Sequence, residues 1–180
     1  MHSIRSASDF SNARSGGNAY ILSGYAAGWT HNLGDGSGAK WVGVDSYGWN
    51  NAYTSHSALY AMKFDLSQAA SSATLNLRFT VDDMLGDVNN EGLFIDGHAI
   101  TGSRSQTDWN NQIENKSWNL GALSAGQHTL YFDVNNYGAG PSGIMFSGNI
   151  HTQAVPEPAS MAALGLGLIG VARRRRARKA

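Results

Sequence analysis

Oxygen-bearing side chains are concentrated in one stretch of the chain, with a spacing that suits a hard cation. Seven of them fall within the fifteen residues that end at Asp96. Calcium takes about six to eight oxygen ligands, many from Asp and Asn side chains in loops. A full EF-hand loop is excluded, because His98 stands where that loop needs a bidentate Glu. We therefore expect either a solvated acidic loop held by Asx turns or a structural Ca2+ whose ligands are Asp82, Asp83, Asp87, Asn89 and Asp96.

The tryptophans divide into two groups by their sequence surroundings. Trp49 and Trp109 lie among Asn, Asp and Gly residues typical of loops. Flat aromatic rings stack on the faces of sugars, so these two are the predicted glycan-binding residues. The alternative is that each loop packs its ring against the domain. Trp41 and Trp118 fall within strand patterns and are predicted to be core residues.

No residues have the spacing of a known catalytic motif. The chain has no cysteine, which excludes thiol nucleophiles and thiolate zinc sites. It also lacks a nucleophile elbow, a phosphate-binding loop and a metal-spaced histidine pair. His128 lies on the apolar face of its strand, where we expect a hydrogen-bonded core residue rather than a base. We predict a protein that is not an enzyme; a small polysaccharide-remodelling hydrolase is the alternative, since two catalytic carboxylates can be distant in sequence.

The C-terminal residues have a chemistry of their own. An apolar run without charge occupies residues 161–172. As a helix it reaches only about 18 Å, which is short of the roughly 30 Å of a bilayer core. Clustered arginines stay on the cytoplasmic side of a membrane, so the chain before the run should face outward. The run is preceded by Val155, Pro156, Glu157 and Pro158 and followed by Arg173, Arg174, Arg175 and Arg176.

This order of a Pro-Glu-Pro motif, a short hydrophobic helix and an arginine cluster resembles the PEP-CTERM sorting signal of Gram-negative bacteria. The resemblance implies that an exosortase-type membrane transpeptidase recognises Pro156, Glu157 and Pro158 and removes the tail. The protein would then be anchored in the inner membrane only transiently, before it reaches the cell surface or the extracellular polysaccharide matrix. An ordinary tail anchor is the alternative. Export also needs a signal peptide, which residues 1–17 do not supply, and we expect one upstream of the printed start.

The charge of the chain is distributed unevenly. The part before Val155 has seven basic and twelve acidic residues, a net charge of −5. Its basic residues are scattered singly, which excludes nucleic-acid binding through a basic patch. About 150 residues can bury roughly two-thirds of their unfolded surface, which is enough for one domain without disulfides.

Apolar residues recur with a period of two, which indicates β-strands. In residues 73–81 the apolar side chains take one face and the polar ones the other, the pattern of a half-buried antiparallel strand. Residues 127–134 alternate in the same way and place Asp133 on the outer face. Asp96-Gly97 between two apolar segments suits a type I′ hairpin turn. Further strands are expected at residues 20–23, 40–44, 58–66, 117–120 and 143–150.

About eight short strands separated by Gly, Asn and Asp clusters predict an all-β, antiparallel jelly-roll β-sandwich. The order of motifs from Trp41 to Ile150 is similar to the galactose-binding-like and carbohydrate-binding modules found before many PEP-CTERM tails. This resemblance implies a structural or glycan-interacting role, with calcium-dependent adhesion as a further alternative. The expected organisation is a flexible N-terminal segment at 1–19, the sandwich at 20–151, and a sorting signal at 152–180 made of a linker and motif (152–160), the hydrophobic helix (161–172) and a basic tip (173–180).

Overall fold

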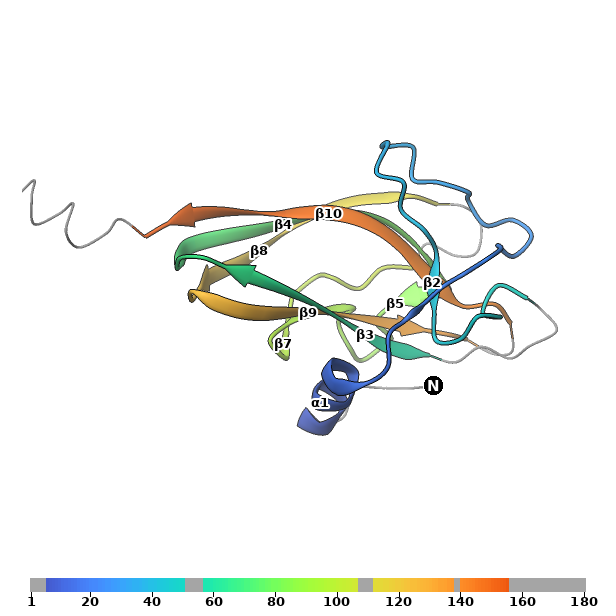
Figure 1. The fold of residues 1–180 in the computed structure, drawn as a ribbon, viewed down its shortest axis with the longest axis horizontal. Helices are drawn as coiled ribbons and strands as arrows, with labels where there is room; N and C mark the ends of the chain where they lie inside the picture. Colours follow the sequence, from blue (N-terminus) through green and yellow to red (C-terminus); the bar gives the residue numbers. More distant parts are fainter. Residues whose placement is uncertain (1–5, 51–56, 107–111, 138–139, 156–180) are drawn as a thin grey trace, which may run out of the picture.

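The computed structural model describes residues 6–50, 57–106, 112–137 and 140–155 of the 180-residue chain. Within them, two antiparallel sheets form two layers (Figure 1). The prediction of a fold built from antiparallel β-strands is confirmed. Among the described residues one short helix accompanies the sheets.

The two sheets are named A and B from here on. Sheet A has the strand order β1-β2-β10-β4-β8, and sheet B has the order β3-β9-β6-β7, with β5 also paired to β9. The strands of sheet A are β1 (Tyr20–Ile21), β2 (Val42–Gly43), β4 (Ala70–Asp82), β8 (Glu114–Leu123) and β10 (Gly143–Ala154). The strands of sheet B are β3 (Ala58–Leu66), β5 (Met84–Leu85), β6 (Leu93–Ile95), β7 (His98–Ala99) and β9 (Gly126–Asn135).

The core lies between the two sheets and follows the period-two pattern. In β4 the side chains of Leu75, Leu77, Phe79 and Val81 are buried, as predicted. They join one cluster with residues of sheet B that include Leu130, Phe132 and Val134. Burial of such side chains is the main force holding the sheets together, at roughly 1.5–3 kcal/mol each.

A second, smaller apolar cluster lies beside the sandwich in the segment that leads to β2. Trp29 and Trp41 stack with their ring centroids 4.0 Å apart, and Met145 of β10 packs against them. Trp41 is 3% exposed, and Trp118 in the main core is 7% exposed. Both are core residues, as predicted.

The predicted hairpin turn is confirmed. Asp96 and Gly97 have φ angles of 51° and 86°, as a type I′ turn requires. The strands on either side pair with Ile95 opposite His98.

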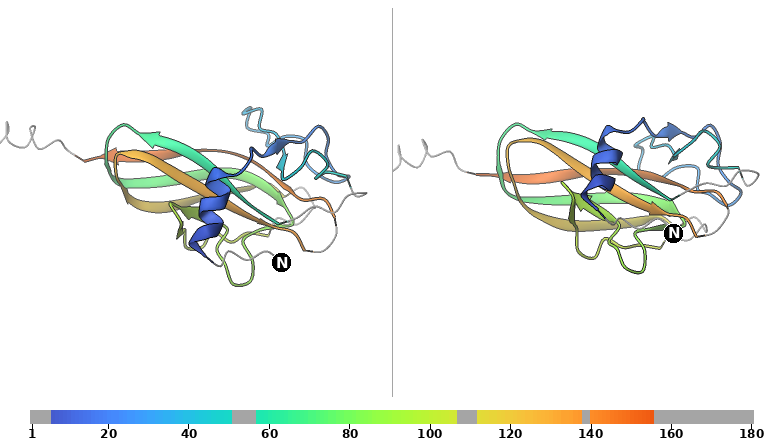
Figure 2. Two further views of the ribbon diagram at one scale, coloured as in Figure 1. Left: turned by 60° about the horizontal axis from the view of Figure 1, so that its bottom comes forward. Right: turned by 90° about the horizontal axis from the view of Figure 1, so that it is seen from below.

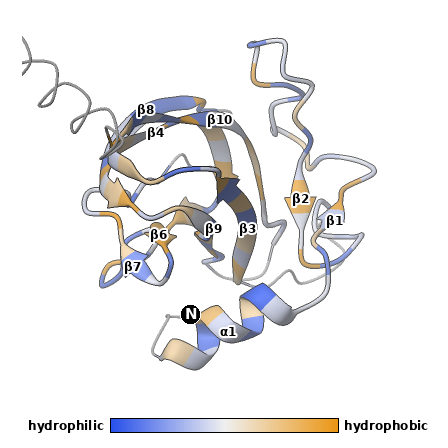
Figure 3. Cartoon of the chain, turned by 60° about the vertical axis from the view of Figure 1, so that its left-hand side comes forward, coloured by the Kyte–Doolittle hydropathy of each residue, from blue (hydrophilic) through white to orange (hydrophobic). Residues whose placement is uncertain are grey.

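The N-terminal segment differs from the prediction. Residues 1–19 were expected to be flexible, but Ala7–Ser15 form helix α1. The Asp9 carboxylate accepts a hydrogen bond from the backbone N–H of Ser6 (3.0 Å), which stabilises the start of the helix. Phe10 packs edge-on against Phe94 and Tyr131, so α1 lies across the outer face of sheet B (Figures 2 and 3). A helix this short carries little periodic signal, and its position depends on this tertiary contact.

The C-terminal prediction falls mostly on residues that the structure does not describe. The hydrophobic helix expected at 161–172 and the basic tip after it lie outside the described residues. Among the helices of the described part, none is long and apolar enough to cross a membrane. What the structure does place is the departure point of the tail. β10 ends at Ala154, at the end of the sandwich away from the loops around residues 22–50 (Figure 1).

Candidate functional site

The acidic residues predicted to bind calcium form hydrogen bonds within the protein. The buried Asp82 carboxylate accepts the indole N–H of Trp29 at 2.6 Å. The Asp83 carboxylate accepts the backbone N–H of Tyr137 at 2.5 Å. Asp82 is the last residue of β4 and Asp83 follows it, so both bonds hold distant loops against this end of the sandwich.

Asp87 and Asn89 belong to a tight loop between β5 and β6. The Asp87 carboxylate accepts the backbone N–H groups of Asn89 (2.6 Å) and Asn90 (2.8 Å). This is the Asx-turn arrangement that the sequence left open as the alternative to a cation. Glu91 in the same loop accepts three further backbone N–H groups, from Gly102, Ser103 and Arg104.

Asp96 pairs with the predicted core histidine. Its carboxylate lies 2.6 Å from Nδ1 of His128, and Nε2 of that ring lies 2.9 Å from the Ser124 carbonyl oxygen. The hydrogen bond to Asp96, followed by the one to Ser124, raises the pKa of His128. The ring is buried and bonded at both nitrogens, as the sequence predicted for a structural histidine.

The five predicted calcium ligands take part in separate hydrogen bonds. In the described ranges no three acidic or histidine side chains are placed to hold one metal ion. The Asx turns and loop-to-strand bonds account for the acidic stretch in the part of the chain that the structure shows.

A carboxylate that the sequence placed on the outer face of β9 is fully buried. Asp133 is 0% exposed, and neither of its carboxylate oxygens has a hydrogen-bond partner among the described residues. Burial, followed by the charge of Asp87, raises the pKa of Asp133 to about 7. Its backbone carbonyl accepts the N–H of Gly86 and its N–H donates to the carbonyl of Gly92, so the loop between β5 and β6 lies beside it. No sequence signal shows this burial, because it depends on a loop some forty positions earlier.

Trp49 does not have the open position expected of a sugar-stacking ring. It is half-buried and packs against the smaller cluster. A Cβ added at Gly24 would lie 3.0 Å from its ring, so the glycine allows the close contact. The packing alternative describes Trp49 better than exposure does. Trp109 lies outside the described residues.

Exposed tyrosines replace Trp49 as the accessible aromatic groups. Tyr20, Tyr25, Tyr47 and Tyr137 are 41–52% exposed. All four lie at the end of the sandwich opposite Ala154, as neighbouring contacts show. Tyr20 pairs with Gly43 in the β1–β2 ladder, which meets the first residues of β10.

The other three tyrosines belong to loops that meet at the same end. Gly24 packs on Trp49, and the Gly48 carbonyl accepts the Ser142 N–H at 2.9 Å, one residue before β10. These contacts bring the loops of Tyr25 and Tyr47 together beside the start of β10. Tyr137 follows β9 and is held there by Asp83.

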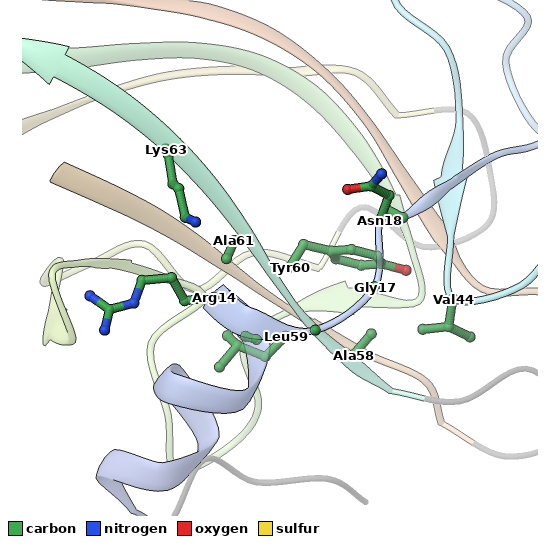
Figure 4. Close-up of a pocket in the computed structure, with 12 residues that line it drawn as sticks. Arg14, Gly17, Asn18, Val44, Ala58, Leu59, Tyr60, Ala61 and Lys63 are labelled. Carbon is green, nitrogen blue, oxygen red and sulfur yellow. The ribbon is translucent and has the colours of Figure 1, made fainter. Parts of the chain in front are cut away.

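A hollow of about 440 Å3 opens from this tyrosine-bearing end along the edge strand β3 (Figure 4). Residues 16–19, which connect α1 to β1, form one wall. Val44 and the first residues of β3 form the other, and Tyr60 lines the space between them. Figure 4 shows Arg14 and Lys63 at one end of the hollow and Val44 at the other.

The basic side chains that line the hollow lie at one of its ends. Its two cations come from the last turn of α1 and the middle of β3. Within the described residues neither Arg14 nor Lys63 forms an ion pair. Burial, followed by the charge of Asp45, raises the pKa of Tyr60 above its ordinary value, so its hydroxyl remains protonated and can donate a hydrogen bond. No pattern in the sequence predicts this site, because its walls are distant in the chain.

The comparison with protein families concerns the other end of the molecule. Residues 154–176 match the PEP-CTERM protein-sorting motif. The chain carries that sorting motif. The motif implies export, sorting at a membrane, and processing by an exosortase-type enzyme. The match covers the predicted Val155, Pro156, Glu157 and Pro158 and the arginines up to Arg176. No curated protein matches the chain.

Proposed function

We propose that this protein is an exported, non-catalytic β-sandwich that acts as a structural or glycan-interacting module at the cell surface or in the polysaccharide matrix. The observation that carries the proposal is that the sorting motif and the exposed tyrosines lie at opposite ends of the sandwich. The sorting motif begins where β10 stops, and the four exposed tyrosines lie where β10 starts. Twelve strand residues separate these ends by about 40 Å. A protein delivered by its tail would thus present its aromatic end away from the tail.

The strand order supports a jelly roll of the carbohydrate-binding kind. A jelly roll has two four-stranded sheets, and most strands that are neighbours in the chain lie in opposite sheets; one hairpin, here β6–β7, stays within a sheet. The order β2-β10-β4-β8 facing β3-β9-β6-β7 follows that connectivity. A galactose-binding-like fold is therefore part of the proposal, although fold does not set function.

Retention on immobilised polysaccharides tests the proposed role. The mature protein, purified from its host, should be retained on at least one polysaccharide and should release no reducing ends from it. Tyr25→Ala combined with Tyr47→Ala should weaken retention about tenfold, since stacked aromatic rings contribute roughly 0.5–1.5 kcal/mol each. Val88→Ala is the control, because Val88 is 60% exposed and lies in the loop between β5 and β6. Equal retention of all variants would refute the role of the tyrosines, and turnover would refute a non-catalytic role.

A further inference from the structure

We infer that the hollow between α1 and β3 binds an anionic group on a glycan chain. This inference rests on the proposed glycan-interacting function and adds the ligand class. It comes from the placement of Arg14 and Lys63 at one end of a space that a sugar unit can enter (Figure 4).

The two cations are available for a ligand. Two other basic side chains of the domain are engaged: Arg78 donates to the Leu33 carbonyl (2.5 Å) and to Asn115 (2.8 Å), and Lys116 pairs with Glu114. Arg14 and Lys63 have no such partner among the described residues. Two unpaired cations beside one hollow attract an anion, in a domain that is otherwise acidic.

The carboxylates near the hollow determine which end of it an anion can occupy. Asp96 lines a neighbouring hollow that shares Arg14, but its carboxylate is held by His128 and by the backbone N–H of Thr129 (2.8 Å). Asp45 acts on the Tyr60 end, where its charge would repel an anion. The anionic group therefore belongs at the end with Arg14 and Lys63.

The remaining walls suit the rest of a sugar unit. The Tyr60 hydroxyl can donate to a ring or glycosidic oxygen because it stays protonated. Gly17 and Asn18 lie outside any helix or strand and leave backbone groups along the opposite wall. Tyr20, which is 51% exposed, follows directly on this wall. An arginine can hold a carboxylate or sulfate through two parallel hydrogen bonds, and a lysine adds a point charge.

The test compares three polysaccharides with the mature protein at low salt. Polygalacturonate carries carboxylates, dextran sulfate carries sulfates, and dextran is neutral. We expect binding to one or both anionic chains, with Arg14→Gln plus Lys63→Gln weakening the affinity about tenfold. Raising the salt concentration should weaken the unmodified protein more than the double variant, because exposed ion pairs are screened.

A matched control separates the hollow from the overall charge. Lys40→Gln plus Arg104→Gln makes the same charge change outside the hollow, and its affinity should stay within twofold. Because Arg14 also lies in the last turn of α1, the single variant Lys63→Gln, on β3, is measured as well. It should lose about threefold with an unchanged melting temperature.

Each outcome decides a different point. Loss confined to the hollow variants supports the inference, and the carboxylated and sulfated chains show which anion is preferred. Equal loss in the control variant, or unchanged affinity in the hollow variants, overturns it. Equal binding to neutral dextran overturns the anion preference but leaves the proposed glycan-interacting function intact. Binding to no polysaccharide overturns both.

Discussion

The outer faces of the two sheets have the same alternating pattern in sequence but different surroundings in the structure. On sheet A, the segment before β2 covers Met145 near the start of β10. Farther along the same face, Asn76 bonds to Asn149 of β10 (3.1 Å) and accepts from the Ser117 hydroxyl of β8 (2.6 Å), and these side chains remain at the surface. On sheet B, α1 and the loop between β5 and β6 lie over the outer face, so Tyr131 and Asp133 are buried. The pattern therefore identifies the face that meets the other sheet. It does not show whether the second face meets water.

The largest effect should come from removing a ring on the covered face. Tyr131→Ala takes away the 3%-exposed side chain on which Phe10 of α1 rests. We expect a loss of about 3–5 kcal/mol in the free energy of unfolding, as for other buried aromatic residues. Urea denaturation followed by tryptophan fluorescence measures it. A loss below about 1 kcal/mol would show that the outer face of sheet B is not part of the stable core.

The second effect is a pH dependence of the free energy of unfolding, caused by Asp133 on the outer face of sheet B. The pKa of Asp133 is raised to about 7, above its ordinary 3.8, by burial and then by the charge of Asp87. The folded state thus keeps a proton that the unfolded state loses. Its contribution to stability is complete below about pH 4 and declines as the pH rises to about 7, by on the order of 4 kcal/mol in total.

The variant Asp133→Asn isolates that carboxylate. An amide of the same shape cannot ionise, so the decline between pH 4 and 7 should flatten and the variant should be the more stable protein at pH 8. The raised pKa of His128, caused first by Asp96, adds a loss in the same direction that remains in the variant above about pH 6.5. An unchanged decline between pH 4 and 6 would contradict the assignment to Asp133.

A smaller effect of opposite sign is expected at Glu91. Its pKa is lowered, because hydrogen bonds from the backbone N–H groups of Gly102, Arg104 and Ser103 outweigh the effect of burial. The stabilisation is present above the ordinary pKa of 4.5 and is lost as the pH falls through the lower folded value. Glu91→Gln should cost about 1 kcal/mol at pH 7 and less at pH 3. Thermal melts at both pH values check the sign, and an equal loss at both would argue against a charge effect.

The smallest effect is expected on the part of the outer face of sheet A that the segment before β2 does not cover. Thr74 lies on the outer side of β4, opposite Asn119 of β8. Thr74→Ala should change the free energy of unfolding by no more than about 0.5 kcal/mol, as for surface positions in general. The same urea experiment applies. A loss approaching that of Tyr131→Ala would mean that the part of the face around Thr74, too, is covered.

Sequence reasoning predicted the features that depend on local pattern. The inward residues of β4, the Asp96-Gly97 turn and the core positions of Trp41 and Trp118 all follow from alternation or turn chemistry, and the structure confirms them. The sorting motif was also identified from residues adjacent in sequence.

The features that sequence reasoning missed depend on contacts between distant segments. Trp49 is half-buried because Gly24 leaves room for its ring. Helix α1 has no strong apolar stripe and is held by one phenylalanine on sheet B. The hollow needs α1 and β3 side by side, and the burial of Asp133 needs a loop and a strand to meet. Neither periodicity nor spacing carries that information.

The most direct test of the account is the C-terminal mass of the protein recovered from its native host, with and without the exosortase-type transpeptidase. The account predicts that the host with the enzyme yields, outside the inner membrane, a form that ends near Val155–Pro158. Without the enzyme, the uncleaved chain should stay with the membrane. Recovery of the intact chain, including Arg173–Arg176, as a soluble cytosolic protein in the unmodified host would contradict it.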